Sequence, residues 1–107
     1  MAQALLMVRA ELQTVADRQA FDRWYEDEHL PEALDAFGAE RAWRCWSVST
    51  PGVHYAFYEF ERLETAQAVQ SSTAMRALAA EFERHWGSRT VRRREILELV
   101  QELKQRS

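Results

Sequence analysis

The segment that most constrains the fold is residues 54–61, which read His-Tyr-Ala-Phe-Tyr-Glu-Phe-Glu. This density of aromatic residues in a short run is typical of a β-strand. Successive side chains of a strand point to opposite faces, so Tyr58 and Phe60 would lie on one face. Tyr55 and Phe57 would lie on the other. Both faces of this strand are apolar, and a sheet that contains it needs cover on both sides.

A second strand is predicted directly before it. Residues 41–49 carry Trp43, Cys45 and Trp46, and the Thr-Pro-Gly sequence at residues 50–52 favours a tight turn. The two strands should therefore form a hairpin. Cys45 is the single cysteine, so no intrachain disulfide is possible, and on a strand we expect it to be buried as a small apolar residue.

Two further strands and two helical regions complete the pattern. Residues 3–12 predict a strand and residues 18–37 a helix. Residues 64–86 predict a second helical region, interrupted at residues 71–73, where Ser and Thr side chains compete for backbone hydrogen bonds. The last strand is expected over residues 89–99, followed by a short polar helix or a frayed end.

The resulting order, β-α-β-β-α-β, predicts an α+β fold of the ferredoxin-like class, with a four-stranded antiparallel sheet and helices on one face. The length of 107 residues indicates a single domain over residues 1–107. The uncovered face would expose a large apolar patch on a monomer, and such patches mark association surfaces. Two sheets that pack together across a two-fold axis would bury it, so we expect a homodimer.

The charge balance argues against several classes of partner. A net charge of −3 gives no electrostatic case for nucleic acid or a membrane surface. The basic run Arg92, Arg93 and Arg94 is followed by Glu95, and we interpret it as a solvated or ion-paired face rather than a phosphate-binding patch. The absence of a long apolar run or a signal-peptide pattern, with one cysteine, leads us to expect a cytoplasmic protein.

The candidate chemistry lies in the helix before Pro31. At about 100° per residue, Glu28 falls between Trp24 and Tyr25 on the apolar face. His29 lies one turn after Tyr25, at the edge of the same face. An imidazole titrates near neutrality, and burial can raise the pKa of a neighbouring carboxylate. Glu28 and His29 are therefore candidate groups for general acid–base catalysis.

Pro31 leaves a second interpretation open. Its ring clashes with the carbonyl four residues earlier and it has no N–H, so it should break or kink the helix. A short helical segment at residues 32–37 would follow, and Gly38 would end it. In a distorted helix Glu28 would turn outward, and His29 would simply donate a hydrogen bond to a freed carbonyl.

Four aromatic residues define a candidate substrate site between the first helix and the sheet: Trp24, Tyr25, Trp46 and Tyr58. An aromatic lining with a few polar tips is typical of a site for a flat organic ligand, although the same residues could form a packed core. The sequence has no Gly-rich phosphate loop, no nucleophile elbow and no Cys-His pairing. We therefore expect no cofactor and no metal site.

Trp24 and Tyr25, followed by His-Leu-Pro-Glu at residues 29–32, resemble the EthD-like group of dimeric α+β barrel proteins. The strand order and length support this resemblance over nearly the whole chain. The resemblance implies a homodimer whose sheets pack together, with a cavity between sheet and helices in each subunit. Relatives of this architecture include cofactor-free monooxygenases, muconolactone isomerases, polyketide cyclases and accessory proteins.

Two hypotheses for function follow. In the first, the cavity binds a small hydrophobic or aromatic molecule, and a cofactor-independent reaction uses His29 as the acid–base group with Glu28 or Tyr58 assisting. The resemblance favours His29 as the residue that faces the cavity. In the second, the chain is a non-catalytic accessory or assembly protein whose aromatic core is filled.

Overall fold

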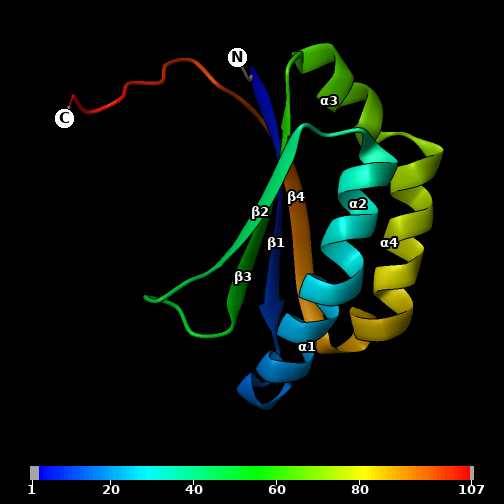
Figure 1. Cartoon of the computed structure of the whole chain (residues 1–107). Coiled ribbons are helices and arrows are strands. Elements are labelled where there is room, and N and C mark those ends of the chain that lie inside the picture. The colour runs from blue at the N-terminus through cyan, green and yellow to red at the C-terminus, as the bar shows by residue number, and fades with distance from the viewer. Residues whose placement is uncertain (1–2, 107) are drawn as a thin grey trace.

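The computed structural model describes residues 3–106, and these contain one antiparallel sheet (Figure 1). Its strands are β1 (Ala4–Leu12), β2 (Arg41–Trp46), β3 (Val53–Phe60) and β4 (Thr90–Glu98). They lie in the spatial order β2-β3-β1-β4, with every neighbouring pair antiparallel. The expected ferredoxin-like topology is confirmed.

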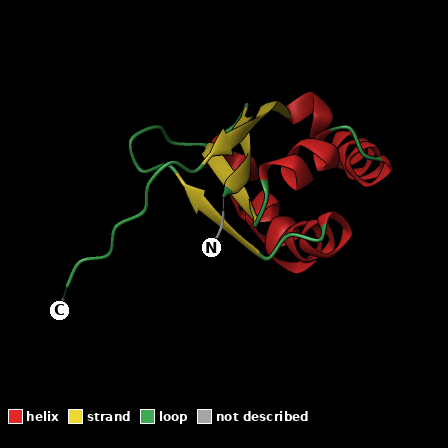
Figure 2. Cartoon of the chain, turned by 90° about the horizontal axis from the view of Figure 1, so that it is seen from above, coloured by secondary structure: helices red, strands yellow, loops and turns green. Residues whose placement is uncertain are grey.

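The helices lie on one side of this sheet (Figure 2). They are α1 (Arg18–Trp24), a π-helical turn (Tyr25–His29), α2 (Leu30–Phe37), α3 (Leu63–Gln70) and α4 (Thr73–Trp86), with short 3-10 turns at Val15–Asp17 and Gly87–Arg89. Among the described residues, no helix has the length and apolar character needed to span a bilayer. The β2–β3 loop and the C-terminal residues extend on the side away from the helices.

The predicted interruption between α3 and α4 is confirmed. Ser72 precedes α4 in an extended conformation, and its hydroxyl accepts a hydrogen bond from the Met75 N–H at 3.0 Å. The same hydroxyl donates to the Val69 carbonyl at 2.7 Å, so one side chain satisfies backbone groups of both helices. Gly38, with φ +64°, ends α2 in the left-handed conformation, as expected.

The strand register gives the sheet two different faces. Leu6 of β1 lies opposite Tyr58 of β3 and Ile96 of β4, and this face is buried beneath the helices. On the other face, which we call the open face, Met7 lies opposite Phe57. Phe57 also stacks on Trp43, with ring centroids 5.7 Å apart. The open face is therefore apolar at its centre, as the sequence predicted, and is only partly covered within one chain.

Pro31 does not break the helix as expected. Residues 18–37 stay helical throughout, because the turn before the proline widens: the Leu30 N–H bonds to the Tyr25 carbonyl, five residues back. A wider turn relieves the clash between the proline ring and the preceding carbonyl, and Pro31 then occupies the first turn of α2, where its missing N–H is tolerated.

One other expectation differs from the structure. Cys45 is exposed rather than buried, because β2 is an edge strand and Cys45 points to the open face. Of the two alternatives for the C-terminal segment, a short helix and a frayed end, the helix is absent: residues 99–106 have no regular structure and trail away from the sheet (Figure 1). The Leu99 N–H still bonds to the Gln3 carbonyl at 2.8 Å, but Val100 and Leu103 are 88% and 83% exposed, too few packing contacts to hold a helix.

Candidate functional site

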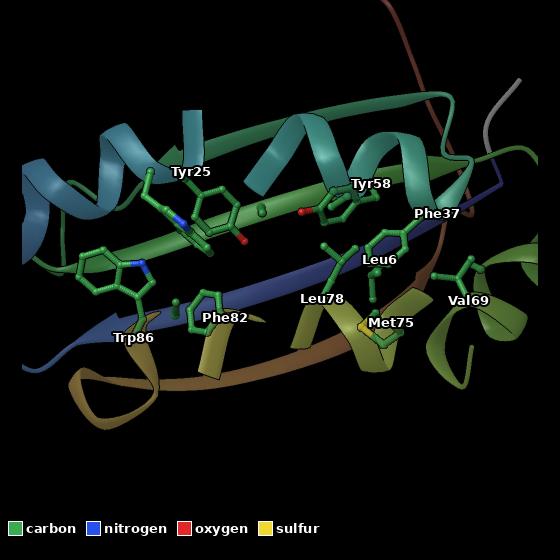
Figure 3. Close-up of a cluster of buried hydrophobic side chains, with 14 of the residues drawn as sticks. Leu6, Tyr25, Phe37, Tyr58, Val69, Met75, Leu78, Phe82 and Trp86 are labelled. Atoms are coloured by element: carbon green, nitrogen blue, oxygen red, sulfur yellow. The ribbon is translucent and has the colours of Figure 1, made fainter. Parts of the chain in front are cut away.

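A cavity of about 210 Å³ lies between the helix-covered face of the sheet, the π-helical turn and α4. Part of its wall is apolar and consists of Val8, Phe37, Met75, Leu78 and Ala79. The rest carries the polar groups of Tyr25, His29 and Tyr58, together with the arginines of β4. Figure 3 shows the hydroxyl tips of Tyr25 and Tyr58 pointing toward one another, with Leu78 nearby. The structure thus brings three of the predicted residues, Tyr25, His29 and Tyr58, to one cavity.

The π-helical turn determines where His29 lies. Its imidazole is 6% exposed and stacks on Trp24, with ring centroids 4.5 Å apart and an interplanar angle of 17°. Trp24 and His29 are five residues apart, a spacing that a π-helical turn places on one face and a regular α-helix does not. The Tyr25 ring packs edge-on against the same imidazole at 4.9 Å.

The His29 imidazole is neutral at physiological pH. Burial, followed by the positive charge of Arg92, lowers the pKa of His29 to about 4. Among the described residues, its buried Nδ1 has no hydrogen-bond partner. A neutral imidazole has one N–H donor and one nitrogen lone pair, so His29 can both donate and accept a hydrogen bond in the cavity.

The two tyrosines are protonated under the same conditions. Burial raises the pKa of Tyr25 to about 12, against the opposing effect of a hydrogen bond with Tyr58. Burial also raises the pKa of Tyr58, and the neighbouring Tyr25 raises it further. Both phenols therefore keep their O–H groups, which can donate to an oxygen of a bound molecule.

Glu28 does not lie on the buried face: its placement between Trp24 and Tyr25 is wrong, and the alternative, in which a distorted helix turns Glu28 outward, agrees with the structure. Its side chain is exposed, whereas Tyr25 and His29 on either side of the turn are buried. The projection at about 100° per residue assumes regular α-helical geometry. The wider turn changes that angle and directs Glu28 to solvent.

Trp46 and Trp24 also lie outside the cavity wall. The Trp46 Nε1–H donates to Asp22 Oδ1 at 2.7 Å, and Arg44 Nη1 donates to the same oxygen at 2.9 Å. Trp46 thereby ties β2 to α1 and lines a separate surface hollow beside Arg18. Trp24 supports the cavity from behind, through its stacking on His29.

Arg92 is the site residue that the sequence interpretation missed. It is half-buried and lines the cavity, and its guanidinium carbon lies 4.0 Å from the centroid of the Phe82 ring. The interpretation of the basic run as a solvated or ion-paired face treats its three residues alike, yet alternate residues of a strand face opposite sides. Thr90 and Ile96 point to the core, so a period of two places Arg92 on the same side. That alternation was the available signal.

The neutral histidines predict a specific pH dependence of stability. Burial lowers the pKa of His29 to about 4 and, with the charge of Arg44, that of His54 to about 3. In the unfolded chain both groups take up protons near pH 6.5. Stability should therefore be full above pH 6.5 and fall as the pH is lowered toward 4, by roughly 3 kcal/mol for His29 alone. Urea unfolding at a series of pH values measures this loss.

His29→Gln is the control for that measurement. Glutamine does not titrate, so the variant should lose less stability than the wild type between pH 6.5 and 4. The hydrogen bond from Trp46 lowers the pKa of Asp22 below 3.8. The stability that Asp22 contributes is therefore lost mainly below pH 3.8, outside the range from pH 6.5 to 4 in which the histidines act. An identical pH dependence in the variant would contradict a neutral, buried His29.

Within residues 3–106, no group of three or more His, Cys, Asp or Glu side chains converges on a point that would hold a metal ion. The polar groups of the cavity are phenols, an imidazole and guanidinium groups. This set suits hydrogen bonding to a small organic molecule.

No protein-family model and no curated protein matches the sequence. Solved structures do match. An ethyl tert-butyl ether d (EthD) family protein from Bacillus halodurans is 18% identical with a TM-score of 0.65, over 90% of this chain and 99% of that one. A dimeric ferredoxin-like protein from an uncultured marine organism is 13% identical with a TM-score of 0.72, over 99% and 95%.

A third match is SnoaB, a cofactor-independent oxygenase from Streptomyces nogalater, at 9% identity and a TM-score of 0.66, over 98% of this chain and 100% of that one. Identities this low establish a shared fold and nothing finer. The chain therefore has the ferredoxin-like α+β fold of EthD-like and dimeric ferredoxin-like proteins, which confirms the fold expected from its sequence.

Proposed function

We propose that this protein is a homodimeric, cofactor-independent enzyme whose cavity binds a small hydrophobic or aromatic molecule, with His29 as the acid–base group. One observation carries the proposal: a neutral imidazole with an unpaired buried nitrogen lines a cavity that also holds two phenol hydroxyls. Glu28 drops out as the assisting group because it is exposed. Tyr58 takes that role.

The residues suggest how a reaction would proceed. The apolar wall holds a flat ring and excludes water, which strengthens polar interactions inside the cavity. His29 accepts a proton from an acidic O–H or C–H of the substrate. Tyr25 or Tyr58 donates a hydrogen bond to the oxygen on which negative charge develops. A proton transfer of this kind is compatible with cofactor-independent monooxygenase, isomerase and cyclase reactions, and the likeness to the cofactor-independent oxygenase SnoaB is consistent with the first of these.

The open face supports the homodimer. Phe57, Trp43 and Tyr55 stack in one row across β2 and β3, and Met7 of β1 lies opposite Phe57. A contiguous apolar patch of this kind favours association. An isologous contact between two copies would cover it without leaving a further apolar surface.

The alternative is a non-catalytic accessory protein, and one observation favours it. Much of the aromatic cluster is filled core: the Phe21 ring is completely buried and packs against Tyr25, Trp86 and His54 at centroid distances of 5.1 to 5.3 Å. The cavity beside this cluster is small. Ligand binding distinguishes the two functions.

Ligand binding can be tested by thermal shift against a panel of aromatic compounds. A compound that binds only the native state stabilises it and so raises the melting temperature. At a free concentration one hundred times its dissociation constant, the compound adds about 2.7 kcal/mol to the free energy of unfolding. Ala79 lines the cavity, so Ala79→Phe should fill it and abolish the shift. Ala80 is exposed on the same helix, so Ala80→Phe should leave the shift intact.

The outcomes of this test separate the hypotheses. Shifts that survive Ala79→Phe would show binding elsewhere, and no shift with any compound would favour the accessory protein. For a compound that binds, His29→Ala should weaken the binding while the oligomeric state stays unchanged. Equal binding by that variant would contradict the role given to His29.

A further inference from the structure

The charges that line the cavity have one sign. Arg92, Arg93 and Arg94 of β4 contribute to the wall, with only Arg92 and Arg94 on the helix-covered face, and no aspartate or glutamate does. The remaining polar groups are two protonated phenols and a neutral imidazole. A cavity with this lining attracts a negatively charged group and disfavours a cation.

Arg92 is the arginine best placed to meet such a group. It lies on the helix-covered face of the sheet, opposite Ala10, and its guanidinium rests on the Phe82 ring. The Phe82 ring in turn packs on the His29 imidazole, with ring centroids 5.8 Å apart, so the Arg92 guanidinium lies near the polar end of the cavity. Arg94, on the same face, is exposed and directs Nη2 toward the Gln70 carbonyl at 3.5 Å.

Arg92 differs from Arg44 and Arg89 in having no anionic partner. Arg44 pairs with Asp22 at 2.9 Å, and Arg89 pairs with Asp17 at 3.3 Å. Within the part of the chain that the structure describes, the Arg92 guanidinium has neither an ion pair nor a hydrogen bond, and the exposed Glu83 that acts on it lies beyond ion-pair distance. A half-buried guanidinium with unused donors is costly unless an anion joins it.

We propose that Arg92 is the anion-binding residue of the cavity, and that the ligand is a small monoanion in which a carboxylate or enolate oxygen is attached to an aromatic or alicyclic body. This inference rests on the proposed function and names the substrate class of that site. Among the described residues Arg44, Arg89 and Arg92, only the Arg92 guanidinium is without an anionic partner, so it matches a ligand with one negative charge. Its planar arrangement of N–H donors can bind both oxygens of a carboxylate. The apolar wall takes the body of the molecule.

The anion would also activate His29. The positive charge of Arg92 is one of the causes that lower the pKa of His29. An anion bound to Arg92 offsets that charge, so the pKa of His29 rises on binding. The imidazole then becomes a stronger base only when the substrate is in place.

Matched neutral and charged probes test the proposal by titration calorimetry: benzoate against benzamide, and 1-naphthoate against 1-naphthamide. The wild type should bind at least one carboxylate about tenfold more tightly than its amide, since a hydrogen bond to a charged group is the stronger kind. Arg92→Met should remove that preference. Arg84→Met, which removes the same charge from an exposed position on α4, should keep it.

Two measurements on the wild type make the test independent of how the variants fold. Added salt should weaken carboxylate binding and leave amide binding unchanged. The pKa of His29, followed by NMR of its ring, should rise with the carboxylate and stay constant with the amide. Equal binding of carboxylate and amide, insensitive to salt, would overturn the anion assignment while leaving the cavity as a neutral-ligand site. Failure of all four probes to bind would contradict both the assignment and the proposed function.

Discussion

Phe57→Asp is expected to convert the proposed homodimer into a monomer. Phe57 lies at the centre of the open face, stacked on Trp43 at 5.7 Å and on Tyr55 at 6.3 Å. In an isologous interface one substitution introduces two carboxylates, one from each subunit. Each buried carboxylate without a partner costs several kcal/mol, so the dissociation constant should rise by a factor of roughly one hundred or more.

Sedimentation velocity over a range of concentrations measures this effect. Ala77→Asp serves as the control, because Ala77 is exposed on α4, on the far side of the molecule from the open face. That variant should sediment as the wild type does. A wild-type chain that stays monomeric at high concentration would refute the homodimer, whatever the variants do.

Phe21→Ala should cause the largest loss of stability of any single truncation in the core. Phe21 is fully buried, and its ring lies within 6.5 Å of six other aromatic rings, which come from α1, the π-helical turn, β2, β3 and α4. Removing a buried phenyl ring costs about 3–5 kcal/mol, because the cavity left behind collapses only in part. This is a large share of the 5–15 kcal/mol or so by which domains are stable.

Urea unfolding followed by tryptophan fluorescence tests the prediction, since four tryptophans report on the fold. Phe21→Leu keeps part of the volume and should lose less stability than Phe21→Ala. Val15→Ala changes a residue that is 63% exposed and should shift stability by less than about 0.5 kcal/mol. Similar losses for Phe21→Ala and Val15→Ala would mean that the aromatic cluster does not hold the two layers together.

The fold was predictable from local signals that agree with one another. The aromatic alternation in residues 54–61, the Thr-Pro-Gly turn and the Ser-Ser-Thr interruption each indicate one element or boundary, and together they leave a single common topology. The two apolar faces of β3 were visible in the same way, because strand periodicity does not depend on tertiary contacts.

The site was predictable only in part, since its geometry depends on departures from regular structure. A projection at constant angle correctly joined His29 to Tyr25, four residues apart, but it could not reveal the extra residue in the turn that sends Glu28 to solvent. The side chain of Trp46 is held by Asp22 of another element, and only tertiary structure shows that hydrogen bond. The position of Arg92 could have been predicted, because the alternation of side chains along β4 places it on the same face as Thr90 and Ile96.

The π-helical turn also limits how this protein can change over evolution. Glu26, Asp27 and Glu28 are exposed, so their identities can drift with little penalty to packing. The number of residues in this stretch is more constrained, because the wide turn holds one residue more than an α-helical turn. Losing one would leave Trp24 and His29 four residues apart, a spacing that a regular α-helix also places on one face, but the Pro31 ring would again meet the carbonyl four residues earlier. Substitutions here are tolerable, whereas a deletion brings back the break in the helix that the wide turn avoids.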